Sequence, residues 1–319
     1  MIKQRIAIPL ILILMLILTA CGSPRTNSPV NTPPINPKAE AANKDTSSVT
    51  LYFGYRGEDL LAGETRKINV PVSDTLEVAV LKALIGGPSA DRDELARLFW
   101  DGVELVGVSS NEDILFVTLS DKFVSTDPGE ISLVEGSVSD QKRLAIYSIV
   151  NTVVEMGKYS RVQIYVDRED NEMGERITRG EAGWSDDQGA YLEPLAREAA
   201  LVLTPENTLR EALESFAMKD WMRLYEFTAY TSPDSTVKPD TAAFSDALTA
   251  AGNGLESYNI TSSNVSSDGK TCVVMLDYSV RTKERGTIDR KDINVVMVRA
   301  NDIWQLSYTS LVKLLINVG

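Results

Sequence analysis

Four serine–lysine pairs in the chain have the spacing of a nucleophile and an assisting base. Ser-x-x-Lys is the pattern of penicillin-interacting enzymes, in which the serine attacks a carbonyl carbon. Their companion motifs Ser-Asp-Asn and Lys-Thr-Gly are missing from the sequence, and ordinary composition readily repeats so short a pattern. For Ser139 the pattern favours a helix cap over catalysis. The pairs are Ser139/Lys142, Ser235/Lys238, Ser267/Lys270 and Ser310/Lys313.

Alternating polar residues at Asp167, Glu169 and Asn171 look like the start of a calcium-binding loop. Such a loop also needs glycine at its sixth position and a bidentate acid at its twelfth. Those positions hold Glu172 and Thr178. The pattern therefore favours a solvated turn, and we expect no metal.

Histidine is absent from the chain, and cysteine occurs twice. Catalysis by Ser-His-Asp or Cys-His, and zinc binding through histidine, are excluded. Cys272 lies in a strand-like stretch, where a cysteine is more often a small core residue than a nucleophile. We expect no catalytic residue, no cofactor and no internal disulfide, because the other cysteine has a different predicted role.

That role is lipidation of Cys21. Lys3 and Arg5 precede an apolar run from Ile6 to Leu18, and small residues follow, as in a secretory signal. The ending Leu18-Thr19-Ala20-Cys21 resembles the lipobox of bacterial lipoproteins, which are cleaved before the cysteine. The resemblance implies a mature protein that begins at Cys21 and is held on the outer face of a membrane. The alternative, a transmembrane helix, needs about 20 apolar residues, and the run is shorter.

The chain is acidic, with a formal net charge of −13. Cleavage before Cys21 removes two cations, Lys3 and Arg5, and no acid, which leaves −15. An acidic surface repels nucleic acid and anionic lipid. We therefore expect no nucleic-acid partner, and membrane contact through the lipid alone.

Prolines and small polar residues dominate residues 22–48, and hydrophobic periodicity is missing there. This composition predicts a disordered tether. With the leader at 1–21, the predicted organisation continues with a domain at 49–168, a linker or extension at 169–203 and a second domain at 204–319.

The elements expected in the first domain begin with a strand at 49–55 and a second at 66–72. Asp74 and Glu77 can form a capping box for a helix over Thr75–Ile85. Gly86-Gly87-Pro88 should end that helix rather than cradle a phosphate.

A hairpin is predicted from 103–108 and 114–119, followed by a loop at 120–136. Apolar spacing predicts a helix over Asp140–Met156, and Arg161–Val166 returns as a strand. The expected fold is a small α/β sandwich with both helices on one face of the sheet.

Several short stretches of this domain have the order and spacing of a known domain family. They are Tyr52-Phe53, Arg66, Leu84-Ile85-Gly86-Gly87-Pro88, Val117-Thr118-Leu119-Ser120 and Val150-Asn151-Thr152. Together they resemble the GerMN domain of sporulation and germination lipoproteins. The resemblance implies a Gram-positive, spore-forming source and a fold like the ring-building domains of envelope assemblies. It also implies protein contacts through the helix faces around Thr75–Ile85 and Asp140–Met156.

Residues 169–203 are open to two interpretations. They are an extension with a linker, or a loop that packs Trp184 against one of the domains. Beyond them, Thr204-Pro205-Glu206 is typical of a helix start. A second helix at Thr241–Ala251 and four strand-like runs predict an α+β cone that resembles NTF2-like domains.

Aromatic residues of the second domain could line a pocket in the cone, although aromatic residues at such spacing are usually core. They are Trp221, Tyr225, Tyr258, Tyr278 and Trp304.

The sequence as a whole predicts an α+β, lipid-anchored, non-enzymatic protein of the cell envelope. It would act as an interaction or assembly module in sporulation or germination. Its partners would be envelope or sporulation proteins, with self-association as a further option. The alternative is a lipoprotein that binds a cell-wall fragment or small lipid in the C-terminal cone. An envelope hydrolase would need a nucleophile or paired acids, and nothing in the sequence singles any out.

Overall fold

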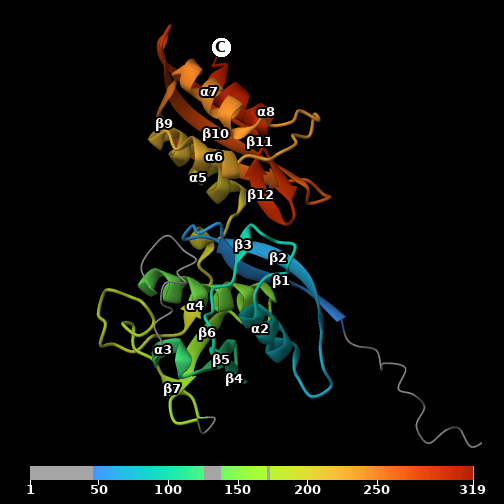
Figure 1. Cartoon of the computed structure of the whole chain (residues 1–319), viewed down its shortest axis with the longest axis vertical. Coiled ribbons are helices and arrows are strands. Elements are labelled where there is room, and N and C mark those ends of the chain that lie inside the picture. Colours follow the sequence, from blue (N-terminus) through green and yellow to red (C-terminus); the bar gives the residue numbers. More distant parts are fainter. Residues whose placement is uncertain (1–45, 126–137, 171–172, 319) are drawn as a thin grey trace, which may run out of the picture. The chain divides into compact units, whose positions relative to one another are not determined.

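Strands near the start of the chain build a first, three-stranded sheet (Figure 1). The computed structural model describes residues 46–125, 138–170 and 173–318. The predicted leader, the lipidation site Cys21 and most of the predicted tether lie outside these ranges. No described helix is long and apolar enough to cross a membrane.

The first sheet has the order β2-β1-β3. β1 begins three residues before the predicted strand, so the end of the predicted tether is strand. β2 also begins earlier than predicted, because residues 61–65 pair with β1 in a continuous antiparallel register. The bounds are β1 Thr46–Tyr55, β2 Leu61–Asn69 and β3 Leu95–Ala96.

A second sheet has the order β4-β5-β6-β7, with β8 also paired to β6. β4 and β5 form the predicted hairpin, and β5 and β6 run parallel. A short helix α3 follows β5, in part of the stretch predicted to be loop. The bounds are β4 Leu105–Asn111, β5 Ile114–Ser120, α3 Lys122–Ser125, β6 Arg161–Asp167, β7 Glu175–Arg176 and β8 Leu195–Ala196.

Helices α2 (Leu76–Gly86) and α4 (Val138–Glu155) lie between the two sheets (Figure 1). The expectation of two helices on one face of a single sheet was therefore wrong. The reason is visible in α4, whose buried residues surround its axis from Leu144 to Val153. A helix that is buried on all sides needs cover on all sides, and two sheets provide it. The broader prediction of an α+β fold is confirmed.

The cap of α2 differs from the predicted capping box. Thr75, not Asp74, accepts from the backbone N–H of Val78. The carboxylate of Glu77 instead accepts hydrogen bonds from Lys158 and Tyr159. The predicted stop is confirmed, since Gly87 has φ of 101° and closes the helix. Glycine adopts this backbone conformation without strain.

Residues 173–196 pack against the second sheet, whereas Val202 and Leu203 contact Leu61 of β2 in the first sheet. β7 and β8 both pair with β6, and the side chains of Ile177, Ala182 and Leu192 are buried. The rings of Trp184 and Tyr147 of α4 lie 5.8 Å apart. A short 3-10 helix, η1 (Ala199–Leu201), precedes the next helix.

Gly183 fixes this segment to α4, and we expect Gly183→Ala to lower the free energy of unfolding by about 1–3 kcal/mol. Its φ is +94°, and a Cβ there would lie 2.2 Å from the backbone oxygen of Ser139. Gly189→Ala is the matched control, because a Cβ there meets nothing within 4 Å. Chemical denaturation measures both variants. Equal stability of the two would contradict the close packing at Gly183.

The C-terminal part, residues 204–318, places helices against a four-stranded antiparallel sheet with the order β12-β11-β10-β9 (Figure 1). Helix α7 has the predicted bounds. The chain does not end in strands as predicted, because Ser307 caps a further short helix that continues as a π-helix. The bounds are α5 Pro205–Met218, α6 Trp221–Glu226, α7 Thr241–Ala251, β9 Gly254–Val265, β10 Thr271–Thr282, β11 Gly286–Ala300, β12 Ile303–Leu306, α8 Tyr308–Leu311 and η2 Val312–Ile316. The NTF2-like assignment stays a prediction.

Candidate interaction site

The serine–lysine pairs lie in unrelated surroundings. Ser139 is the second residue of α4 rather than its cap, and Ser267 lies in the β9–β10 turn. Ser310 is buried, and its Oγ accepts from the backbone N–H of Val296.

Lys238 is buried and its Nζ donates to two backbone carbonyls, those of Tyr225 at 2.8 Å and Thr228 at 2.6 Å. Burial lowers its pKa to about 8. Its Nζ also lies 3.6 Å from the centre of the Tyr225 ring. These are the contacts of a cation that holds the end of α6, and they give Lys238 a structural role.

Cys272 is buried in β10, and burial raises the pKa of its thiol. Its surroundings are those of a small core residue. Of the predicted calcium loop, Asp167 is buried at the end of β6 and Glu169 is exposed, while Asn171 lies outside the described residues. Within the described ranges, no group of three acidic or cysteine side chains is arranged to hold a metal ion.

The aromatic set does not converge on one cavity. Trp221 packs on Phe216, and Tyr225 packs edge-on against Phe244. Tyr258 donates to Glu214 of α5. Tyr278 lines a hollow of about 370 Å³ beside η2.

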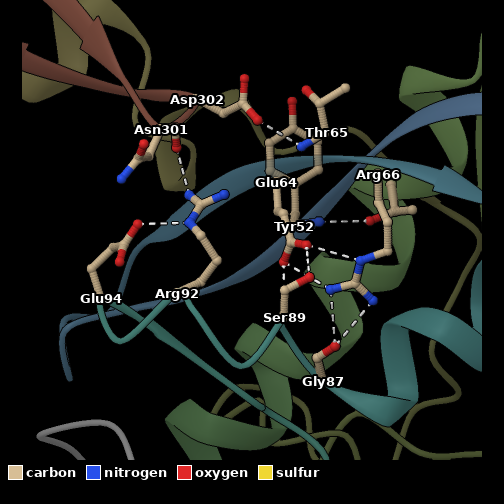
Figure 2. A network of polar contacts seen from close by, with 11 residues as sticks. Tyr52, Glu64, Thr65, Arg66, Gly87, Ser89, Arg92, Glu94, Asn301 and Asp302 are labelled. Carbon is tan, nitrogen blue, oxygen red and sulfur yellow. Dashed lines mark hydrogen bonds and ion pairs between the residues drawn. The ribbon is translucent and has the colours of Figure 1, made fainter.

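A buried carboxylate, Glu64 of β2, is the centre of a polar network at the end of α2 (Figure 2). Arg66 donates to both of its oxygens at 2.8 and 2.9 Å, and Ser89 donates through its backbone N–H at 3.1 Å and its hydroxyl at 2.5 Å. Burial by itself raises the pKa of Glu64, but these hydrogen bonds bring it below its ordinary value. Arg66 also donates to the carbonyl of Gly87. Two of the stretches on which the resemblance rests thus meet here.

The same region of β2 contacts the β11–β12 turn (Figure 2). Arg92 donates to the carbonyl of Asn301 at 2.5 Å, and Asp302 accepts from the backbone N–H of Thr65 at 2.9 Å. Both turn residues have positive φ, 47° and 64°, as a two-residue hairpin of this kind requires. All described residues belong to one compact unit. Within it, this turn contacts the first sheet.

Arg223 of α6 forms a further contact between parts that are distant in the sequence. It donates to both oxygens of Glu58 at 2.8 and 2.9 Å and to Glu211 at 2.6 Å. It also donates to Ser215 Oγ and lies 5.1 Å from the centre of the Phe227 ring. Burial by itself lowers the pKa of the guanidinium, but the two carboxylates raise it above its ordinary value. One cation therefore holds two carboxylates from distant parts of the sequence.

The predicted contact faces on α2 and α4 are largely covered by the two sheets. Such helices offer too little exposed surface for an interface of ordinary size, which needs about 800 Å² per partner. The sequence-based expectation about these faces is therefore corrected. Exposed positions within the two helices are Lys82, Gly86, Ser139 and Glu155.

The start of β1 differs from the helix faces, because among the described strands only β2 pairs with it. β3 pairs only with Gly54 and Tyr55, and the backbone N–H of Tyr52 donates to Thr152 of α4. Beside residues 47–50 lies a groove of about 470 Å³, also lined by residues from the start of α2 and the end of α4. Sequence reasoning assigned Ser47 and Ser48 of this stretch to the tether. The change from proline-rich sequence to β-branched residues at Thr46 was the available signal.

An ion pair between the buried carboxylate of Glu77 and the exposed side chain of Lys158 borders this groove. Glu77 accepts from Lys158 Nζ at 2.7 Å and from the Tyr159 hydroxyl at 2.9 Å. Burial by itself raises the pKa of Glu77, but these hydrogen bonds lower it to about 2. These contacts hold the start of α2 against Lys158 and Tyr159, which follow α4.

We expect acid to weaken the fold through Glu77. Its ordinary pKa is 4.5, and in the folded protein it is about 2. The stabilisation is therefore complete above pH 4.5 and is lost as the pH falls towards 2, because only the unfolded chain takes up the proton early. Urea denaturation over this range should show a smaller loss of stability for Glu77→Gln than for the wild type. Exposed Glu112→Gln is the control, and parallel curves for Glu77→Gln and the wild type would refute the prediction.

The described fold defines residues 46–203 as an α+β domain with helices between two sheets. Residues 50–172 match the family model Germane, described as sporulation and spore germination. The chain therefore carries a GerMN domain, as the sequence motifs predicted.

Solved structures that are similar to the chain include the following two. One contains the tandem GerMN domains of the sporulation protein GerM from Bacillus subtilis, with 18% identity and a TM-score of 0.31, over 48% of this chain and 45% of that one. The chain thus spans less than half of that protein's structure. The other is a candidate lipoprotein from Clostridium perfringens, with 24% identity and a TM-score of 0.23, over 40% of this chain and 77% of that one. No curated protein matches the chain.

Proposed function

We propose that the protein is a lipid-anchored, non-enzymatic component of the cell envelope that acts by protein contacts in sporulation or spore germination. The match of residues 50–172 to a sporulation and germination family carries this proposal. The lipobox-like ending at Cys21 supplies the anchor, and the predicted tether separates it from β1. The strongly acidic chain fits membrane attachment through lipid rather than through a basic surface.

The anchor is tested by Cys21→Ala in the source bacterium, with Cys272→Ala as the matched control. Cys21→Ala should move the protein out of the membrane fraction and abolish incorporation of labelled fatty acid. Cys272→Ala removes the other cysteine and should change neither result. Fatty-acid labelling that survives Cys21→Ala would contradict the assignment.

The sporulation role is tested by deleting the gene and counting heat-resistant spores and germination rate. Wild-type protein should restore the deletion strain, and the Cys21→Ala variant should not. Normal spores and normal germination in the deletion strain would contradict the proposed role. Turnover of a cell-wall substrate by the purified protein would contradict its non-enzymatic part.

A further inference from the structure

Two adjoining hollows flank η2 in the C-terminal part of the chain. The first, of about 410 Å³, lies between the end of α7, the β10–β11 turn and the end of η2. The second, of about 370 Å³, is the hollow beside η2 that Tyr278 lines. Asn317 lines both hollows, so we treat them as one site and call it the η2 groove. Each hollow alone has the size of an ordinary ligand pocket. Polar residues that line the η2 groove include Asn253, Lys283, Glu284, Arg285, Lys313 and Asn317.

The η2 groove is positively charged, although the chain as a whole is acidic. Lys283 and Arg285 line the first hollow and Lys313 lines the second, and all three side chains are exposed. Within the described residues none of the three forms an ion pair, whereas other arginines of the same sheet do. Glu284 is the single acid among the described residues that line the two hollows. Arg290 also lines the second hollow, but it has contacts of its own and is not counted among these cations.

Neighbouring residues fix these cations beside the hollows. Lys283 lies over Gly252, where φ is +59° and a Cβ would be 2.1 Å from the Cε of the lysine. The negative C-terminal end of α7 attracts this ammonium, which accounts for one cation of the three. The turn that carries Arg285 is held by Thr282, whose hydroxyl accepts from the backbone N–H of Arg285 at 3.1 Å. A described carboxylate accounts for neither Arg285 nor Lys313, so both can meet an anion in the groove.

The wall between the two hollows is a π-helix, a rare element that is found frequently at functional sites. In η2 the backbone N–H of Asn317 donates to the carbonyl of Val312 at 2.7 Å. The side-chain amide of Asn253 donates to the carbonyls of Leu315 at 2.9 Å and Ile316 at 3.1 Å. These bonds satisfy carbonyls that a regular helix end leaves unpaired. They hold the wall of the groove in one position before any ligand binds.

We propose that the η2 groove binds an anionic polymer with repeated phosphodiester groups, on the outer side of the membrane. Lysine and arginine are the usual phosphate-binding side chains, and the groove has both. A chain that places charges at both hollows gains from the second contact without a second loss of free motion, which favours a polymer over one compact anion. The acidic remainder of the protein repels such a polymer, so binding is confined to the groove. The location of the polymer rests on the proposed place of the protein in the envelope, whereas the binding chemistry does not.

Calorimetry of the full chain in detergent micelles, with poly(glycerol phosphate) as the probe, tests the site. Binding should weaken as salt is added, because counterions of the polymer are released on contact with cations. Arg285→Glu combined with Lys313→Glu should lower the affinity by about tenfold or more, since both cations become repulsive. Lys283 is left in place because it also stabilises the end of α7. Melting curves should show that the double variant is folded.

The matched control combines Lys67→Glu with Lys270→Glu. Both lysines are exposed and line neither hollow, and the change in net charge is the same. This variant should bind the polymer with close to wild-type affinity. Equal losses for the two double variants would overturn the groove as the site, and so would wild-type affinity for the Arg285→Glu and Lys313→Glu combination.

Two competitors separate the polymer from other sources of phosphate. Inorganic phosphate at the same total phosphate concentration should leave most of the polymer bound, and so should micelles doped with phosphatidylglycerol. Equal displacement by inorganic phosphate would reduce the groove to a site for a single anion. Displacement by the lipid would assign the groove to the membrane surface. Either result would overturn the proposal.

Failure of the proposed function gives a different result. If fatty-acid labelling survived Cys21→Ala, or the deletion strain made normal spores, the proposed function would fail while polymer binding by the purified protein would persist. A membrane-bound protein with a sporulation role that does not bind the polymer would overturn the assignment of the groove alone.

Discussion

Arg66→Ala is expected to lower the free energy of unfolding by about 3–5 kcal/mol, the range seen when one partner of a buried ion pair is removed. The side chain of Glu64 is only 6% exposed, and Arg66 supplies its neutralising charge. Without Arg66, the carboxylate keeps its bonds from Ser89 but remains buried without a cation. The carbonyl of Gly87 also loses its donor. Chemical denaturation at neutral pH measures the loss.

Arg281→Ala is the control for this prediction. Arg281 pairs with Glu256 at the same 2.8 Å separation, but its side chain is 70% exposed. Exposed pairs contribute about 0–1 kcal/mol, so this variant should stay close to the wild type. Replacing both Glu64 and Arg66 by apolar residues of similar size should recover much of the loss, since no unpaired charge remains. A loss for Arg66→Ala no larger than that for Arg281→Ala would show that Glu64 does not depend on this cation.

Arg223→Ala is expected to lower the free energy of unfolding by about 2–4 kcal/mol, a range set by charged hydrogen bonds that are only partly buried. The change leaves Glu58 and Glu211, which are 25% and 18% exposed, facing the same space without a cation. Arg223→Lys should give an intermediate loss. A lysine cannot reproduce the planar, two-pronged contact with Glu58.

Adding Glu58→Gln to Arg223→Ala separates charge from packing. The double variant removes one of the two unpaired carboxylates, so it should be more stable than Arg223→Ala alone. In the wild-type background the same Glu58→Gln change should be destabilising, because it removes a partner of Arg223. A double variant less stable than Arg223→Ala would mean that packing of the guanidinium on Phe227, rather than charge, accounts for the loss.

Local signals were sufficient for several elements. Gly87 ended α2 as expected, and Thr204 with Pro205 started α5 where the capping pattern placed it. The bounds of α7 also agreed with the prediction. These features depend on a few neighbouring residues, whose side chains and backbone preferences act within one turn or one strand.

Other sequence-based predictions were wrong or could not be made, because contacts between residues distant in the sequence determine those features. Glu77 suited a capping box, but Lys158 and Tyr159 bind its carboxylate instead. Glu64 sits in a strand where a carboxylate is unexpected, and it is explained only by Arg66 and Ser89. The place of β1 between β2 and β3 could not be derived from local sequence, because it depends on which distant strands pair with it.

The sequence by itself determined the kinds of element, the chemistry excluded by the lack of histidine, and the GerMN resemblance. The tertiary structure decided that two helices lie between two sheets, that residues 173–196 pack on the second sheet, and that β2 alone of the described strands pairs with the start of β1. The physical reason is range: caps, turns and strand composition act between near neighbours. Burial, ion pairing and strand order depend on residues up to 237 positions apart, such as Thr65 and Asp302.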